Sequence, residues 1–280
     1  MVFPYATTRA GAVGRSRAIS TLSGDLYSKS LRITQHVNVI IPDESEDFWT
    51  KIDDEIRVLY LLHGLGSNSN EWTRFSMIEA YAKIYGFAVI MPDGNRSFYE
   101  NVTYGPHYLD WISQELPGLI HTWFRLPSDR NHTFIAGESM GGFGALRIAL
   151  ENPDRYGGAV ALSPVTDPLA LVNDFSSLFF GSDEWRAVFG PSGPLEDDSI
   201  ASTARMSVLS HGAGAIPRII QMVGTDDPFC PYVEEVAREL TRLGIQNSFS
   251  SWPGRHDFLF WNTAIERAIR MLCGMEGSGC

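Results

Sequence analysis

The chain has few cysteines and no block of basic residues. Its 280 residues include three cysteines, Cys230, Cys273 and Cys280, and these form no C-x-x-C pair. The sequence therefore predicts neither a disulfide framework nor a metal site built from cysteine. The formal net charge is −11, and lysine and arginine are scattered along the chain. A surface of this charge repels phosphate backbones, which argues against nucleic acid as a partner.

Long apolar runs are also missing. No segment reaches the roughly 18 uninterrupted apolar residues that a membrane-spanning helix requires. The first twenty residues contain three arginines, but no continuous apolar stretch follows them, so a secretory signal peptide is not predicted. We therefore expect a cytoplasmic protein that does not associate with a membrane.

The length and composition favour one globular domain. With 44% hydrophobic residues, the chain can bury a large core, and single domains of this size are common. We expect one domain over residues 30–273. A loosely ordered segment is expected at 1–29 and a flexible, glycine-containing tail at 274–280.

Short apolar runs alternate with segments of helical periodicity through this domain. Strands are predicted at 31–41, 57–62, 87–91, 132–136, 159–162, 218–223 and near 249. Helices are predicted at 76–85, 108–124, 142–151, 232–243 and 262–272. Such alternation requires a mostly parallel sheet with helices on both faces, a doubly wound α/β architecture. The first strand is expected at the sheet edge, and Pro117 is expected to kink or split its helix.

One stretch interrupts the alternation. Residues 166–216 are rich in glycine, proline, serine and aspartate, and we expect them to form an insertion over the carboxyl ends of the strands. The aromatic side chains of this insertion, Phe179 among them, either line a substrate pocket or belong to the core.

A candidate nucleophile lies between a predicted strand and a predicted helix. The segment Gly137-Glu138-Ser139-Met140-Gly141 matches G-x-S-x-G, a sharp turn that lifts a serine hydroxyl clear of the strand end. Glycine is needed at both ends because a Cβ there would strike the neighbouring backbone. The strand-turn-helix context makes Ser139 the candidate nucleophile.

A serine hydroxyl needs a base to take its proton and an acid to orient that base. In proteins with this turn, the order along the chain is serine, acid, histidine. The loop 224–228 follows the strand 218–223 and contains Asp226 and Asp227, of which we prefer Asp227. His256 is the one histidine beyond them, in a loop before the final helix, and is therefore the candidate base.

An ester carbonyl under attack also needs N–H donors for its oxygen, each worth roughly 3 kcal/mol. Met140, directly after the nucleophile, is expected to supply one donor. The glycine-flanked Leu65, after the strand 57–62, is the candidate for the second. His63 is expected to form hydrogen bonds within this loop and not to act as a base.

Further polar and aromatic residues follow strands, at the rim where α/β folds assemble their sites. Trp72, Arg96 and Tyr99 are candidates for substrate contact, with a purely structural role as the alternative. Asp93 and Asn95 are expected to stabilise their turn through side-chain hydrogen bonds to nearby backbone.

Taken together, several motifs resemble one known family. The stretches are 60–65 (YLLHGL), 71–72 (EW), 91–99 (MPDGNRSFY) and 137–145 (GESMGGFGA). They resemble the putative-esterase family of α/β-hydrolases, which includes tributyrin esterase, S-formylglutathione hydrolase (esterase D), feruloyl esterases and the mycolyltransferase antigens. The likeness covers about 31–272 and is strongest to the tributyrin esterase branch, whose acid and histidine loops resemble 224–227 (GTDD) and 254–258 (GRHDF). Pro228 departs from that pattern and leaves the choice between Asp226 and Asp227 open.

The resemblance implies a carboxylesterase that hydrolyses small, short-acyl esters through an acyl-enzyme, without a metal or an organic cofactor. The same residues fit an S-formylglutathione-type thioesterase or a feruloyl or acetyl esterase. An acyltransferase or a catalytically inert binding protein on the same scaffold is the alternative of another class. Homo-oligomers are common in this family, and the sequence leaves the oligomeric state open.

Overall fold

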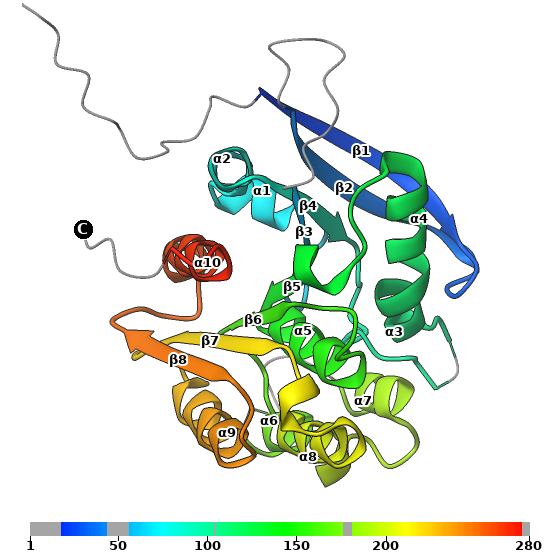
Figure 1. The fold of residues 1–280 in the computed structure, drawn as a ribbon. Helices are drawn as coiled ribbons and strands as arrows, with labels where there is room; N and C mark the ends of the chain where they lie inside the picture. Colours follow the sequence, from blue (N-terminus) through cyan, green and yellow to red (C-terminus); the bar gives the residue numbers. More distant parts are fainter. Residues whose placement is uncertain (1–17, 44–55, 104, 176–180, 276–280) are drawn as a thin grey trace, which may run out of the picture.

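The computed structural model describes residues 18–43, 56–103, 105–175 and 181–275, which are built around an eight-stranded sheet (Figure 1). The strand order is β1-β2-β4-β3-β5-β6-β7-β8. The strands are β1 Ala18–Ser28, β2 Ile33–Asp43, β3 Arg57–Leu62, β4 Phe87–Pro92, β5 Thr133–Glu138, β6 Gly158–Leu162, β7 Arg218–Gly224 and β8 Asn247–Trp252. From β4 to β8 neighbouring strands are parallel, whereas β1 and β2 pair in antiparallel fashion.

Helices cover both faces of this sheet. The α-helices are α1 Glu71–Phe75, α2 Ile78–Tyr85, α3 Tyr108–Asp110, α4 Leu116–Phe124, α5 Met140–Glu151, α6 Pro168–Phe175, α7 Ser182–Phe189, α8 Ile200–His211, α9 Cys230–Arg242 and α10 Phe258–Leu272. Shorter 3-10 turns lie at Arg130–His132, Glu196–Asp198 and Ala213–Ala215. One apolar core packs α2 and α10 against the sheet, and a second packs α4, α5, α8 and α9 against the other face. The predicted doubly wound α/β fold is therefore confirmed.

The N-terminal edge of the sheet differs from the prediction. All eleven residues of β1 pair with β2, so 18–28 are not loosely ordered, and β2 is not the edge strand. The sequence of β1 is polar and contains Gly24, so no buried apolar run reveals it. Its backbone ladder with β2 holds it in place, and this pairing cannot be read from local periodicity.

The predicted helix 108–124 is helical throughout and is not split in two, but its hydrogen-bond pattern changes just before Pro117. A π-helical turn at Trp111–Glu115 lies between α3 and α4. Pro117 has no N–H to donate to the carbonyl of Ser113 four residues earlier. The guanidinium of Arg155 donates to that carbonyl instead, so a distant side chain supplies the hydrogen bond that proline removes.

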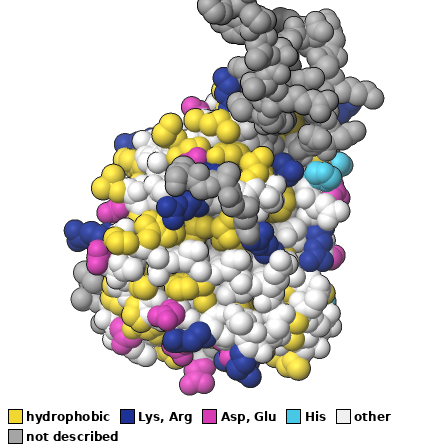
Figure 2. Space-filling view, turned by 60° about the vertical axis from the view of Figure 1, so that its left-hand side comes forward, with side chains coloured by type: hydrophobic (Ala, Val, Ile, Leu, Met, Phe, Trp, Pro, Cys, Tyr) yellow, Lys and Arg dark blue, Asp and Glu magenta, His cyan; other side chains and the backbone are white. Residues whose placement is uncertain are grey.

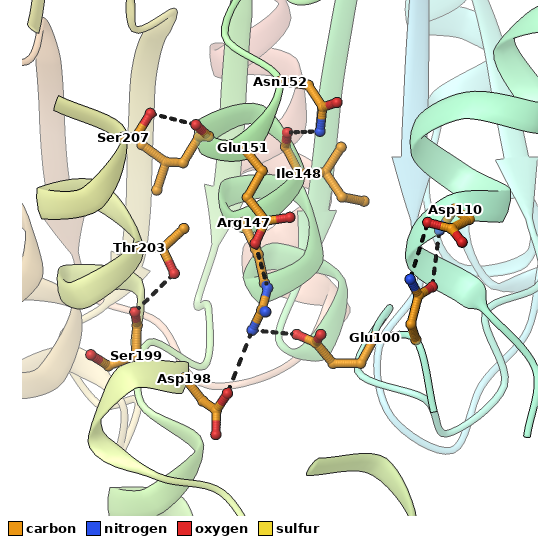
Figure 3. Close-up of polar contacts among 12 residues, drawn as sticks. Glu100, Asp110, Arg147, Ile148, Glu151, Asn152, Asp198, Ser199, Thr203 and Ser207 are labelled. Atoms are coloured by element: carbon orange, nitrogen blue, oxygen red, sulfur yellow. Dashed lines mark hydrogen bonds and ion pairs between the residues drawn. The ribbon is translucent and has the colours of Figure 1, made fainter. Parts of the chain in front are cut away.

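The predicted insertion contains two kinds of structure. Its first part lies over the carboxyl ends of the strands, where Leu171 of α6 lines the same cavity as Ser139. Its last helix, α8, instead packs beside α5 on the face of the sheet, and Ser207 donates to the Leu150 carbonyl there (Figure 3). Because α8 is rich in serine and threonine, its periodicity did not identify it as a covering helix.

Hydrophobic side chains gather on the face that carries α10 (Figure 2). Exposed large hydrophobic residues on or next to α1, α2 and α10 include Phe75, Met77, Ile84 and Leu259. Within the described ranges, no helix combines the length and apolarity that crossing a membrane would need. The cytoplasmic location stays a prediction, and the oligomeric state stays open.

Candidate active site

Ser139 occupies the sharp turn between β5 and α5. Its backbone has φ 54° and ψ −117°, in the left-handed half of φ space that non-glycine residues rarely adopt. Hydrogen bonds hold this conformation: the Ser139 N–H donates to the Leu162 carbonyl at 2.9 Å, and the Ser139 carbonyl accepts from the Val165 N–H at 3.1 Å. Strained backbone maintained by its surroundings is typical of functional sites.

The two glycines of the motif are sterically required. A Cβ on Gly137 would lie 2.3 Å from the carbonyl carbon and oxygen of Gly141. A Cβ on Gly141 would lie 2.5 Å from the carbonyl oxygen of Leu62 at the end of β3. Both obstacles are backbone atoms, so any side chain at either position would displace the turn.

His256 connects the serine to a carboxylate. Its Nε2 lies 3.0 Å from Ser139 Oγ, and its Nδ1 lies 2.8 Å from Asp227 Oδ2. Because a carboxylate can only accept, Nδ1 carries the proton, and Nε2 is then free to accept from the serine hydroxyl. The rings of Phe229 and Trp261 contact the imidazole edge-on, with centroids 4.8 and 4.9 Å away, and fix its orientation.

Asp227, not Asp226, is the carboxylate that contacts His256. The Asp227 side chain is fully buried and also accepts from the Phe229 N–H at 2.9 Å. Burial acts to raise the pKa of Asp227. The hydrogen bond from His256, the charge of that ring and the hydrogen bond from the Phe229 N–H have a larger combined effect, so the pKa is lowered. The Asp226 side chain is exposed.

A cavity of about 120 Å³ opens beside these groups. Ser139 and His256 line it together with Leu65 and Met140, the two residues expected to supply oxyanion donors. Its apolar wall is formed by Phe98, Val165, Leu171, Phe229 and Trp261. The nucleophile and its base therefore face a small, mainly apolar chamber.

Trp72 and Tyr99 are not at the rim, and the expectation that they contact substrate is wrong. Each side chain is 1% exposed. The Trp72 indole donates to the Leu62 carbonyl at 3.1 Å, and the Tyr99 hydroxyl donates to the His63 carbonyl at 2.9 Å. Both rings are packed in the core, and their hydrogen bonds hold the backbone at the end of β3 and in the loop after it.

Arg96 lies at the surface and links the loop after β4 to α7. Its guanidinium pairs with Glu184 of α7 at 2.8 Å, and both side chains are 44% exposed. The neighbouring Phe98, which the sequence did not single out, is the residue of this loop that lines the cavity. Phe179 lies outside the described residues.

His63 is a structural residue of the loop after β3. Its Nε2 accepts from the Gly94 N–H at 2.8 Å, so Nδ1 carries the proton and donates to the Gly64 carbonyl at 2.8 Å. Burial lowers the pKa of His63, which keeps the ring neutral. The hydrogen bond expected within this loop is present, and a second one reaches the loop after β4.

The expected turn residues connect neighbouring loops instead of closing only their own turn. Asp93 accepts from the Ser69 N–H, and the amide of Asn95 donates to the hydroxyl of Tyr108. Both contacts reach beyond the turn that contains them, so these side chains hold the segments around the site together.

The sequence also missed two acidic residues of the site. Glu71 and Glu138 line the same cavity as Ser139. Glu138 occupies a variable position of the G-x-S-x-G motif, and Glu71 begins α1, so neither belongs to a motif that predicts a role.

The fold and this site define the class of the protein: it is a serine hydrolase with the α/β-hydrolase fold. Residues 28–272 match the family described as Putative esterase. The chain belongs to this family and is a serine ester hydrolase.

Named relatives agree with this assignment. The chain is 29% identical over 255 residues to an acetyl esterase of Caldicellulosiruptor saccharolyticus, covering 89% of this chain and 96% of the relative. It is similar to the structure of FphF, a fluorophosphonate-binding serine hydrolase of Staphylococcus aureus, with TM-score 0.81 and 30% identity over 92% of this chain and 99% of that one. The S-formylglutathione hydrolase FrmB from the same organism gives a TM-score of 0.80 and 30% identity, covering 91% and 99%. The likeness therefore concerns nearly the whole of each relative.

Proposed function

We propose that this protein hydrolyses short-acyl carboxylic esters through Ser139, His256 and Asp227. The observation that carries the proposal is the continuous hydrogen-bonded chain from Asp227 through His256 to Ser139 Oγ, at 2.8 and 3.0 Å, beside the cavity. Such a chain activates a serine for attack on a carbonyl carbon.

In the first half-reaction, Ser139 Oγ bonds to the ester carbonyl carbon while His256 Nε2 takes the hydroxyl proton. The N–H groups of Met140 and Leu65 meet the negative charge that develops on the carbonyl oxygen. When the tetrahedral intermediate collapses, the carbon–oxygen bond to the alcohol breaks, and His256 gives its proton to the departing alcohol. Asp227 stabilises the imidazolium between these two transfers.

In the second half-reaction, water attacks the acyl-Ser139 carbonyl, and His256 takes a proton from that water. Collapse of the second intermediate breaks the bond to Ser139 Oγ, which recovers its proton from His256. The products are the carboxylic acid and the free enzyme, so the cycle uses only water and groups already at the site.

The size of the cavity supports short acyl groups. Its volume of about 120 Å³ is well below the ~300–1,000 Å³ of pockets that hold drug-sized ligands. Phe98, Val165 and Leu171 form its apolar wall. The likeness to an acetyl esterase points the same way.

A thioester substrate is the second candidate. The likeness to an S-formylglutathione hydrolase, at 30% identity over 91% of the chain, supports it. Attack on a thioester uses the same nucleophile, base and oxyanion donors, with a thiol as the leaving group. A formyl group would also fit the small cavity.

Steady-state kinetics on p-nitrophenyl esters from acetate to octanoate, run beside S-formylglutathione and methyl ferulate, test the proposal. We expect kcat/KM to be highest for acetate to butyrate and to fall for longer chains. Ser139→Ala should keep the wild-type melting temperature and lose turnover. Turnover by Ser139→Ala at the wild-type rate would contradict the mechanism. A kcat/KM that is highest for octanoate would contradict the substrate class.

A further inference from the structure

Two carboxyl groups meet behind the loop that carries Leu65. Glu138 ends β5 directly before Ser139, and Glu71 begins α1. Their side chains are in hydrogen-bond contact, and both line the cavity that contains Ser139. Glu138 is 1% exposed, whereas Glu71 is partly buried.

Both acids lie against Gly64, the residue before Leu65. The Gly64 N–H donates to Glu71 Oε2 at 3.4 Å, and the Glu138 carboxyl lies against the same residue. A Cβ on Gly64 would lie 2.4 Å from both carboxyl oxygens of Glu138. Glycine at this position is therefore what allows the carboxyl to lie against the backbone, one residue before Leu65.

The pair needs a shared proton. Two ionised carboxylates in contact in a buried site repel each other, and neither can donate a hydrogen bond. Burial, followed by the charge of Glu71, raises the pKa of Glu138 well above its usual range. A proton on Glu138 would let its O–H donate to the Glu71 side chain.

We propose that Glu138 and Glu71 form an acid–carboxylate pair that positions the Gly64–Leu65 backbone, so that the Leu65 N–H meets the oxyanion. The pair acts through Gly64, so both acids are positioning residues. This inference rests on the proposed esterase mechanism and adds to it the device that holds one oxyanion donor in place.

The geometry explains why a pair is used. The Gly64 carbonyl is already fixed by His63 Nδ1–H at 2.8 Å, and the pair fixes the N–H side of the same residue. A backbone donor held from both sides needs no reorganisation when charge develops on the substrate, which is the basis of oxyanion stabilisation. Keeping Glu138 neutral also places less negative charge beside the developing oxyanion.

Substitutions at the two acids test the proposal with p-nitrophenyl acetate as substrate. Glu71→Ala and Glu138→Ala should lower kcat by about tenfold or more with little change in KM. This loss is smaller than the ~10²–10³-fold loss seen when an oxyanion donor is removed, because the Leu65 N–H is displaced and not lost. Glu138→Gln should recover most of the loss relative to Glu138→Ala, because the amide still donates to Glu71. Glu234→Gln, at an exposed position of α9, is the matched control and should behave as wild type.

A second readout is the affinity for a trifluoromethyl ketone, which forms a tetrahedral oxyanion on Ser139. It should weaken in both alanine variants in proportion to kcat and recover in Glu138→Gln. Unchanged kcat in Glu71→Ala, or Glu138→Gln no better than Glu138→Ala, would overturn the inference. If Glu138→Ala does not fold, Glu71→Ala and Glu138→Gln are compared with wild type: we expect a lower kcat in Glu71→Ala and a kcat close to wild type in Glu138→Gln, and unchanged kcat in Glu71→Ala overturns the inference.

Failure of the two proposals can be told apart. If wild type hydrolyses the ester and Ser139→Ala does not, the proposed function stands whatever the acids do. If the acids then have no effect on kcat or on ketone affinity, only the positioning role fails. A wild-type protein without ester turnover would remove the proposed function, and with it the basis of this inference.

Discussion

Asp226 and Asp227 are neighbours in the chain, yet they face different environments. Asp227 lies in the core against His256 and the Phe229 N–H, whereas Asp226 faces solvent. The turn after β7 decides this, because successive side chains in a turn point in different directions. At the scale of single residues, burial and the contact with His256 therefore give two identical side chains different roles.

Substituting these two aspartates tests that distinction. Asp227→Asn should lower kcat by roughly 10³–10⁴-fold, because an amide no longer fixes the His256 tautomer or stabilises the imidazolium. Asp226→Asn should stay within about twofold of wild type, since surface substitutions rarely perturb a distant site. Burst and steady-state kinetics on p-nitrophenyl acetate measure both variants. Equal effects of the two substitutions would refute the assignment of Asp227.

At the scale of elements, Arg147 of α5 joins three segments of the chain (Figure 3). Its guanidinium lies 2.6 Å from Glu100 in the loop after β4, 3.0 Å from Glu151 of α5 and 3.9 Å from Asp198 before α8. Since α5 starts at Met140, this network anchors the helix that carries the nucleophile turn. Burial raises the pKa of Glu100 to about 8, although the charge of Arg147 acts to lower it.

The stability of the protein should therefore depend on pH through Glu100. Between the ordinary glutamate pKa and about 8, the folded state holds a proton that the unfolded state has lost, so stability falls as pH rises through this range. The glutamine of Glu100→Gln does not titrate. As pH rises, the free energy of unfolding of wild type should therefore decline relative to this variant, by up to ~1.4 kcal/mol per pH unit. Urea denaturation at pH 5.5, 7 and 8.5 gives the difference. A difference that stays constant with pH would contradict this role.

At the scale of the whole molecule, the formal net charge of −11 acts on every charged substrate that approaches. Long-range repulsion slows the encounter with anionic esters, and salt screens it. Neutral esters do not experience this effect. The charge therefore biases the enzyme towards uncharged substrates without any contact in the cavity.

Ionic strength tests this bias. Raising NaCl from 10 to 300 mM should increase kcat/KM for mono-p-nitrophenyl succinate, which carries a free carboxylate, by about two- to tenfold, at the low end of steering effects. The value for neutral p-nitrophenyl acetate should change little and serves as the control. The same salt response for both esters would show that net charge does not influence substrate encounter.

Much of the fold was predictable because its signals are local. Alternating apolar runs and helical segments predicted the parallel sheet, since buried parallel strands must be apolar along their length. The strand β1 and the helix α8 were missed because neither has a clear local hydrophobic pattern. The ladder with β2 holds β1, and α8 lacks a clear apolar stripe. Backbone pairing with the next strand decided β1, and packing against α5 decided α8.

The sequence by itself determined the nucleophile turn and the order of serine, acid and histidine, because steric demands of a tight turn and the chain order of the fold are properties of short segments. Only the tertiary structure decided which aspartate meets His256, and that Trp72 and Tyr99 belong to the core. It alone also brought Glu71 against Glu138. These outcomes depend on burial and on contacts between distant segments, and packing of the whole chain sets both.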